Sequence, residues 1–248
     1  MATAKDIINE LQRMFPESLE EEWDRTEGLV SGNINTKVNN IILALEFRNG
    51  IQDKKADMII VHHPPIFGHK KQVTNPFYKK NMHNNKVVYA IHSRLDKTGF
   101  ANKALAEKLF GAFKYDIFKI LSDGTVIIEL DKPLTKTKII NNIKNKLMLK
   151  AVNAITKKGK IKKIAIHGGK GFNQHHVIAA SKEGIDLYLG GDMSHHLAEH
   201  AHFFNVNFID IFHFSEQEGM RKLTKVLSER FPKVNFTYVK QMPLWSTR

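Results

Sequence analysis

Short apolar stretches of strand length alternate with stretches of helical period along most of this chain. The apolar stretches cover residues 41–45, 58–61, 87–91, 125–130, 152–155, 161–166, 187–189, 206–211 and 236–239. The helical stretches cover residues 4–15, 101–110, 135–149, 174–182, 195–204 and 216–231. Strands that alternate with helices indicate an α/β fold with largely parallel sheets. Thr135 is expected to cap the third helix.

The domain organisation follows from the same pattern. No low-complexity linker divides the 248 residues, and the best boundary lies near residues 111–115. We therefore predict a first α/β domain over residues 1–112 and a second over residues 113–248, with the last helix and strand able to pack back on the first domain.

Composition excludes several classes of protein. The chain has no cysteine, so it has no disulfide and no thiolate nucleophile, and any metal site must use His, Asp and Glu. No apolar run approaches the ~18 residues that span a bilayer. The N-terminal stretch is too polar and acidic for a secretory signal. A cytoplasmic protein with no membrane partner is expected.

The basic charge is concentrated in one stretch. The net charge is +13, and residues 132–163 hold eleven lysines with no acidic residue. Such a stretch is either a solvated surface or an attraction for an anion, such as a nucleotide or nucleic acid. It contains no aromatic residue, so stacking of bases on it is not indicated.

The thirteen histidines gather mainly at strand ends, where ligand sites form in α/β sheets. His62 and His63 follow one strand, and a Pro-Pro turn comes next. His92 and Asp96 follow another. The alternative for the His pair is that both are loop histidines that bind no ligand. The alternative for Asp96 is that it caps the following helix.

Two further groups lie near later strands. Gly190, Gly191 and Asp192 precede His195 and His196, where His196 is a candidate substrate contact and Asp192 is a ligand-site residue or a helix cap. His213 and Glu216 stand at the start of the last helix, where Ser215 or Glu216 is alternatively a cap.

Three His, one Asp and one Glu form a nitrogen and oxygen ligand set that fits Zn, Mn, Fe or Ni. Five ligands exceed what one tetrahedral zinc needs, so two divalent ions that share Asp96 fit better. The sequence has no P-loop and no nucleophile elbow, which argues against phosphoryl transfer and serine-esterase chemistry.

The chain resembles the NIF-three-like family, whose members are often labelled GTP cyclohydrolase I type 2 homologues. The segments that carry the likeness read WDRTEGLVSG from residue 23, DMIIVHHPPIF from residue 57, AIHSRLD from residue 90, GGKG from residue 168, GDMSHH from residue 191 and IDIFHFSE from residue 209.

The resemblance implies two similar α/β domains with a dinuclear metal site in the cleft between them, in a ring-shaped homohexamer. It implies that the metal ligands are His62, His63, Asp96, His213 and Glu216. The family's label implies a divalent-metal-dependent hydrolase that opens the guanine ring of GTP and releases formate. His92 or His196 would move the proton.

Three positions depart from the family pattern. The closing His and Glu are separated by one residue fewer than usual, so Glu216 is the preferred ligand and Glu218 the fallback. Arg94 replaces a frequent Asn, and Phe212 replaces a usual Gly. These changes bear on the substrate rather than on the metals.

A non-enzymatic reading stays open. A metal-containing ring with this positive charge would bind nucleic acid or a protein partner, with the metals structural. Release of formate from GTP favours the enzyme, whereas salt-dependent nucleic-acid binding without turnover favours the scaffold.

Overall fold

The computed structural model describes residues 1–24, 27–48, 50–51, 55–65, 86–157 and 159–242. The chain divides into two compact units. Unit 1 contains Met1–Thr98 and Met220–Gln241, and unit 2 contains Gly99–Gly219 together with Met242. The segment Met220–Gln241 therefore returns the chain to unit 1.

Unit 1 is built on a five-stranded sheet in the order β1-β4-β3-β2-β11. The three pairings from β4 to β11 are parallel, and β1 is antiparallel to β4. The strands are β1 (Gly28–Ser31), β2 (Asn40–Glu46), β3 (Met58–His63), β4 (Val87–Ala90) and β11 (Asn235–Tyr238). The helices are α1 (Ala4–Met14), η1 (Glu17–Leu19), η2 (Glu22–Asp24), α3 (Ser93–Lys97) and the larger part of α8 (Gln217–Arg230).

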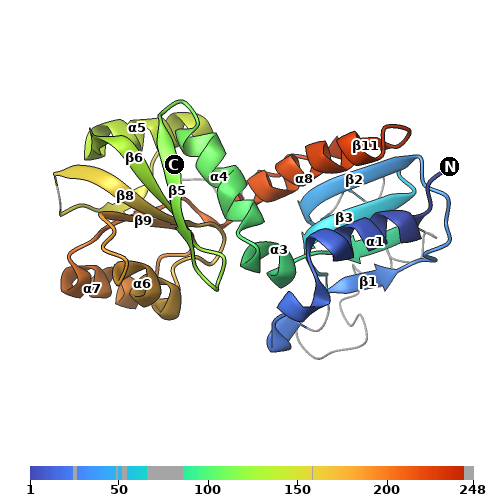
Figure 1. Ribbon diagram of the computed structural model, residues 1–248, viewed down its shortest axis with the longest axis horizontal. Helices are drawn as coiled ribbons and strands as arrows, with labels where there is room; N and C mark the ends of the chain where they lie inside the picture. Colours follow the sequence, from blue (N-terminus) through green and yellow to red (C-terminus); the bar gives the residue numbers. More distant parts are fainter. Residues whose placement is uncertain (25–26, 49, 52–54, 66–85, 158, 243–248) are drawn as a thin grey trace. The chain divides into compact units, whose positions relative to one another are not determined.

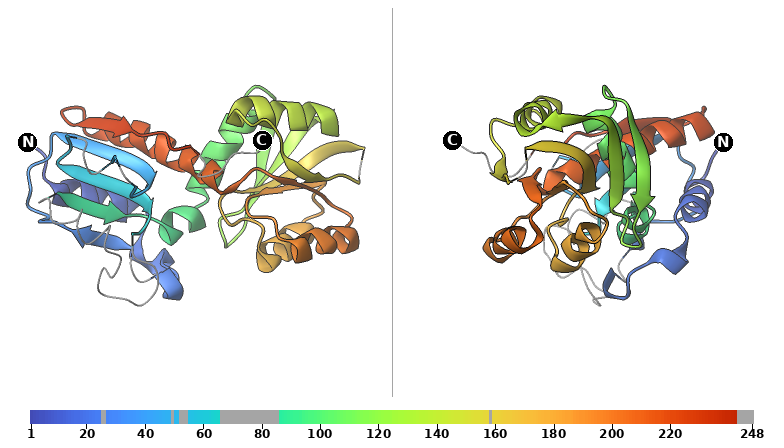
Figure 2. Two further views of the ribbon diagram at one scale, coloured as in Figure 1. Left: turned by 180° about the vertical axis from the view of Figure 1, so that it is seen from behind. Right: turned by 60° about the vertical axis from the view of Figure 1, so that its left-hand side comes forward.

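The central strands of unit 1 are buried on both faces. Every residue of β3 and of β4 is buried. Parallel strands covered on both faces read as continuous apolar runs, which explains why these runs show no alternation. Figures 1 and 2 show α1 and α8 alongside this sheet. Helix α1 begins at a capping box in which Thr3 and Asp6 satisfy each other's backbone N–H groups.

Unit 2 is built on a six-stranded sheet in the order β5-β6-β8-β9-β10-β7. Only the β8–β9 and β9–β10 pairings are parallel, and the other three are antiparallel. The strands are β5 (Tyr115–Ile120), β6 (Val126–Thr135), β7 (Asn153–Ile155), β8 (Lys160–His167), β9 (Leu187–Gly190) and β10 (Asn207–Asp210). The helices are α4 (Phe100–Phe110), α5 (Lys136–Leu147), α6 (Gln174–Ser181), α7 (His195–Phe204) and η3 (His213–Glu216).

Helices cover both faces of the unit 2 sheet, giving three layers (Figure 1). Leu109 of α4 and Ile143 of α5 pack with Ile128 in the core on one face. Val177 of α6 and Ala201 of α7 pack with Tyr188 in the core on the other face. The carboxyl ends of β8, β9 and β10 therefore lie at one edge of a sheet that is rigidly held on both sides.

The α/β class predicted from the sequence is confirmed. The unit 1 sheet is largely parallel as predicted, whereas the unit 2 sheet has more antiparallel than parallel pairings. Strands β1 and β5, which lie at sheet edges and contain no buried residue, were not predicted. Thr135 caps α5 as expected, since its side chain accepts from the backbone N–H of Lys138. Among the described residues, no helix has the length and apolarity that a membrane crossing requires.

Candidate metal centre

His62 and His63 are the last two residues of β3 and are both buried. The Nδ1 atom of His62 donates to the carbonyl of Ile91 at 3.0 Å, and the Nδ1 atom of His63 donates to Glu46 Oε1 at 3.0 Å. Glu46 reaches His63 because the two residues are directly paired in the parallel β2–β3 register. In both rings the bonded Nδ1–H leaves Nε2 with the lone pair that a metal binds.

Asp96 lies one turn into α3, and its Oδ2 atom is 3.6 Å from Nε2 of His62. Helix α3 follows β4, so the end of β4 places this carboxylate beside the end of β3. The cap of the next helix is Gly99 rather than Asp96. Three residues predicted as ligands, His62, His63 and Asp96, therefore come together within unit 1.

His92 completes a cluster of imidazoles in unit 1. Its ring lies 4.9 Å from the ring of His62 and 5.2 Å from that of His63, measured between centroids. One nitrogen from each of these three histidines falls within 4.8 Å of the others. His92, which is predicted to be catalytic, thus lies beside the predicted ligands His62 and His63.

Asp24 orients His92, and the sequence analysis did not single out this role. The fully buried Asp24 carboxylate accepts from Nδ1 of His92 at 2.7 Å and from the backbone N–H of Ser93 at 3.1 Å. Burial alone would lower the pKa of His92. The hydrogen bond to Asp24 and the negative charge of Asp96 outweigh it, so the pKa of His92 lies above its ordinary value.

Glu27 holds the segment that follows His92. Its carboxylate accepts from the backbone N–H of His92 at 2.8 Å, from Ser93 Oγ at 3.0 Å and from Arg94 Nε at 2.9 Å. The Arg94 guanidinium, which replaces the frequent Asn of the family, is buried and also donates to the hydroxyl of Tyr89. Two acidic residues of the segment from residue 23 thus fix the geometry of the segment from residue 90.

His213 and Glu216 come together within unit 2. They are the first and last residues of the 3-10 helix η3, and His213 Nε2 lies 3.5 Å from Glu216 Oε2. A 3-10 helix has three residues per turn, so residues three apart lie on the same side. This geometry explains how the shortened spacing still brings the two side chains together. Glu218, the fallback ligand, lies in α8 and is also buried.

Asp192 supports His213 in the same way that Glu46 supports His63. Its Oδ2 atom accepts from Nδ1 of His213 at 2.7 Å. The cap of α7 is Ser194, whose side chain accepts from the N–H of Leu197, so the capping alternative for Asp192 is wrong. All three histidines predicted as ligands therefore have Nδ1 bonded to an oxygen.

Two glycines make room for η3. A Cβ atom on Gly169, whose φ is +59°, would overlap the carboxylate of Glu216. A Cβ atom on Gly191 would collide with the carbonyl of Gly169 and lie 2.8 Å from the N–H nitrogen of His213. The Gly-rich turns that carry the family likeness are thus required by the close approach of backbone to His213 and Glu216.

His196 lies on α7 with its side chain 88% exposed, 3.9 Å from Glu199. It belongs to none of the His and carboxylate groups found among the described residues, whereas His92 does. The structure therefore gives His92, and not His196, a place beside predicted ligands within its own unit.

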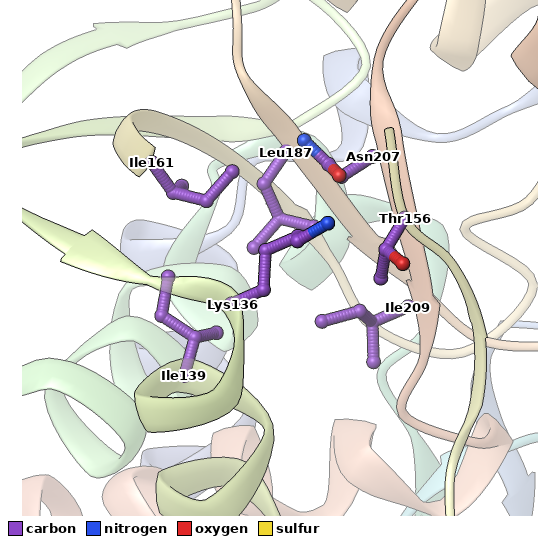
Figure 3. Close-up of a pocket in the computed structure, with 7 residues that line it drawn as sticks. All are labelled: Lys136, Ile139, Thr156, Ile161, Leu187, Asn207 and Ile209. Atoms are coloured by element: carbon purple, nitrogen blue, oxygen red, sulfur yellow. The ribbon is translucent and has the colours of Figure 1, made fainter. Parts of the chain in front are cut away.

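The lysine-rich stretch runs through the end of β6, α5, β7 and β8, and only Lys158 lies outside the described residues. Lys162 pairs with Glu129 at 2.7 Å, and Lys163 lies 3.7 Å from the ring centre of Phe118. Figure 3 shows Lys136 reaching across an apolar depression toward Thr156 and Asn207. That depression has no room for a water molecule, so it is not a ligand pocket.

Comparison with known proteins agrees with this geometry. The family model of Duf34/NIF3 (NGG1p interacting factor 3) matches residues 2–243. A GTP cyclohydrolase 1 type 2 homolog from Clostridium perfringens is 30% identical over 242 residues, which cover 91% of each chain. A GTP cyclohydrolase 1 type 2 from Helicobacter pylori is 24% identical over 238 residues, which cover 93% of each chain.

Solved structures show the same fold. The crystal structure of a hypothetical protein from Staphylococcus aureus superposes with a TM-score of 0.86 at 24% identity and 99% coverage of both chains. That of a Bacillus cereus protein related to NIF3 superposes with a TM-score of 0.83 at 20% identity, covering 100% of this chain and 99% of the other. With a family model matched over nearly its whole length, this chain belongs to the Duf34/NIF3 family.

Proposed function

We propose that this protein is a divalent-metal-dependent hydrolase that acts on a purine nucleotide. The proposed metal ligands are His62, His63, Asp96, His213 and Glu216. The observation that carries the proposal is that the three histidines proposed as ligands are all held by a hydrogen bond at the same ring nitrogen. Each ring has Nδ1 bonded to an oxygen acceptor, which is Ile91 O, Glu46 or Asp192.

This arrangement is typical of metal-binding histidines. A ligating imidazole almost always donates its second N–H to a carboxylate or a carbonyl, which fixes the tautomer and the ring orientation. In this protein two of the three acceptors are carboxylates, Glu46 and Asp192, and the third is the carbonyl of Ile91. The residues therefore fit the predicted cation.

The ligand types favour two ions of the Zn, Mn, Fe or Ni class. Five nitrogen and oxygen ligands exceed the need of one tetrahedral ion, and a carboxylate such as Asp96 is suited to bridging. When bound, divalent ions lower the pKa of water and stabilise negative charge on oxygen. The rest of the chemistry falls to side chains of the chain itself.

His92 is the proposed proton carrier. Because Nδ1 of His92 donates to Asp24, its Nε2 atom is the one that accepts a proton from water or donates one to a leaving group. Asp24 is a positioning residue, since its carboxylate accepts from Nδ1 of His92 and from the backbone N–H of the neighbouring Ser93. The pair resembles in role the carboxylate that orients a catalytic imidazole.

An exposed aromatic side chain beside His92 supports a base-containing substrate. Trp23 is 54% exposed, and its ring meets the His92 ring edge-on at 5.6 Å between centroids. An exposed indole offers a face on which a purine stacks, worth about 1–3 kcal/mol. Together with the names of the relatives from Clostridium perfringens and Helicobacter pylori, this favours GTP as the first substrate to test.

The first experiment measures metal content and formate release from GTP in the purified protein. His63→Ala is expected to lose bound metal and turnover, because it removes a ligand. His195→Ala is the matched control, since His195 is 82% exposed and should keep both. Full metal content and full activity in His63→Ala would show that the ligand assignment is wrong.

A second experiment separates proton transfer from metal binding. His92→Ala and Asp24→Asn are expected to keep the metal content and lower kcat by about 100-fold, the usual contribution of general acid–base catalysis. Trp23→Ala should instead raise KM by about tenfold while leaving kcat nearly unchanged, as expected for a stacking contact. If neither the wild-type protein nor any variant hydrolyses a nucleotide of a test panel, this result would count against an enzymatic function.

The lysine-rich stretch favours a second candidate, a metal-containing scaffold that binds nucleic acid. Residues 132–163 carry eleven positive charges and no negative ones. Neutralisation of phosphates by lysine makes affinity fall steeply with salt. Binding of RNA or DNA that weakens with added KCl, in a protein that turns over no nucleotide, would establish this alternative.

A further inference from the structure

Unit 2 contains a second cluster of metal-ligating side chains, formed by Asp123, His167 and His176, none of which belongs to the ligand set proposed above. Asp123 lies in the turn between β5 and β6, His167 ends β8, and His176 lies in the first turn of α6. One ligand atom from each residue falls within 4.8 Å of the other two. Three elements that are distant in sequence therefore bring these groups together.

The hydroxyl of Thr125 holds the ring of His167. Its oxygen lies 2.8 Å from Nδ1 of His167, and both residues are buried. In the tautomer in which Nδ1 donates to this oxygen, the lone pair of the ring is on Nε2, as in a metal-ligating imidazole whose second nitrogen is held by the protein.

Asp123 is oriented as well. Its Oδ1 atom accepts from the backbone N–H of Thr125 at 2.8 Å, and its Oδ2 atom lies 3.7 Å from Nε2 of His176. This distance of 3.7 Å is too long for a hydrogen bond, but the two atoms are close enough to reach one cation. Thr125 thus supports two of the three members, one with its hydroxyl and one with its backbone.

We propose that Asp123, His167 and His176 bind a divalent cation of the zinc class, at a site separate from the ligand set of the proposed function. Two imidazoles and one carboxylate are a protein ligand set that leaves one position of a tetrahedral zinc open. Thr125 orients His167 with its hydroxyl and Asp123 with its backbone N–H, as the groups behind the ligands do in known zinc sites.

The site closes by a small movement of one ring. The rings of His167 and His176 are stacked, 4.3 Å apart and tilted by 20°, so their lone pairs do not yet converge. Ligand atoms around tetrahedral zinc lie about 3.4 Å apart, given bonds of about 2.1 Å. His176 is the member that turns, because its side chain is 26% exposed whereas His167 is buried.

The test counts Zn²⁺ bound per chain and follows the visible spectrum of the Co²⁺-substituted protein. His176→Gln is expected to lose one equivalent of Zn²⁺ and the corresponding part of the Co²⁺ absorption. His175→Gln is the matched control, because it is the exposed neighbouring histidine on the same helix and should bind as much metal as the wild type. Equal Zn²⁺ content in both variants would overturn the proposal.

A second variant guards against a folding defect. Asp123→Asn changes a turn residue whose side chain is 19% exposed, and it should lose the same equivalent. Comparison with His63→Ala keeps this proposal separate from the proposed function. His63→Ala is expected to retain the equivalent that His176→Gln loses, so each site can fail without the other.

Discussion

Glu27 shows at the scale of a single residue how a buried carboxylate organises its surroundings. It satisfies the backbone of His92, the hydroxyl of Ser93 and the guanidinium of Arg94 at once. The Arg94–Glu27 ion pair lies almost wholly out of solvent, with side chains 2% and 0% exposed. A buried charge is tolerated in such a place only when it is paired and hydrogen-bonded.

Removal of Glu27 is therefore expected to be costly. Glu27→Ala leaves the Arg94 charge buried without its partner, which should lower the free energy of unfolding by about 3–5 kcal/mol. Urea denaturation followed by circular dichroism measures the change. Glu22→Ala, at an exposed position in the same segment, should cost less than about 1 kcal/mol. Similar costs for the two variants would contradict the argument.

Phe212 carries backbone strain next to a proposed ligand. Its φ is 62° and its ψ is 155°, a region that only glycine adopts without strain. The family usually has glycine here, so this chain holds a Phe in a conformation suited to Gly. The strain persists because Gly191 and Gly169 bring the surrounding backbone close to η3.

Phe212→Gly should relieve this strain. We expect it to be less destabilising than Phe214→Gly by at least about 1 kcal/mol, because residue 214 lies in a helical turn and gains nothing from glycine. Thermal unfolding of the two variants provides the comparison. A larger loss for Phe212→Gly would mean that the packing of its ring outweighs the backbone strain.

Among the helices, α5 has an unfavourable distribution of charge at its N-terminus. Its first turn contains Lys136 and Lys138 and no acidic residue, although negative charge is the favourable one at a helix N-terminus. The side chain of Thr135 accepts from the N–H of Lys138 at 3.3 Å and satisfies one of the first backbone donors. The cap therefore matters more in α5 than in a helix with acidic residues in its first turn.

Thr135→Ala should lower the free energy of unfolding by about 1 kcal/mol through loss of this cap. Thr135→Asp should instead keep or increase stability, because its carboxylate both caps the helix and offsets the charge of the two lysines. Chemical denaturation of the two variants gives the order. Equal stability for the Ala and Asp variants would show that the cap contributes little.

The elements also show which parts of the sequence were informative. Long periodic stretches such as α1, α5 and α8 were predicted near their observed positions, because an apolar stripe repeats along each. The sequence predicted that the strand before His62 ends at residue 61, whereas β3 extends to His63. Polar residues such as His62 and His63 at the end of a buried strand resemble loop residues, so the pattern of apolarity did not include them in the strand.

For the whole molecule, the pH dependence of stability provides a test of burial in unit 2. The pKa of His167 falls from 6.5 to about 4 on folding. Because the unfolded chain binds a proton that the folded protein excludes, the stability is complete above pH 6.5 and declines as the pH falls toward 4. The decline amounts to about 3 kcal/mol.

The measurement is the unfolding free energy between pH 7 and pH 4 in the presence of a chelator, for wild type and His167→Gln. The variant should lose less stability over this range, because glutamine at position 167 does not bind a proton in the unfolded chain. Parallel curves would show that His167 is not buried as a neutral ring in solution.

The α/β class, most of the helices and central strands, and the family could be predicted from the amino-acid sequence. The residue types of the candidate metal centre could be predicted as well, since strand ends and glycine turns are local signals. Which oxygen bonds to each imidazole, in contrast, follows from the three-dimensional packing of the chain. Glu46 reaches His63 through the register of two parallel strands, and Asp24 reaches His92 across 68 positions of the chain. Such pairings depend on sheet register and packing, which no local periodicity encodes.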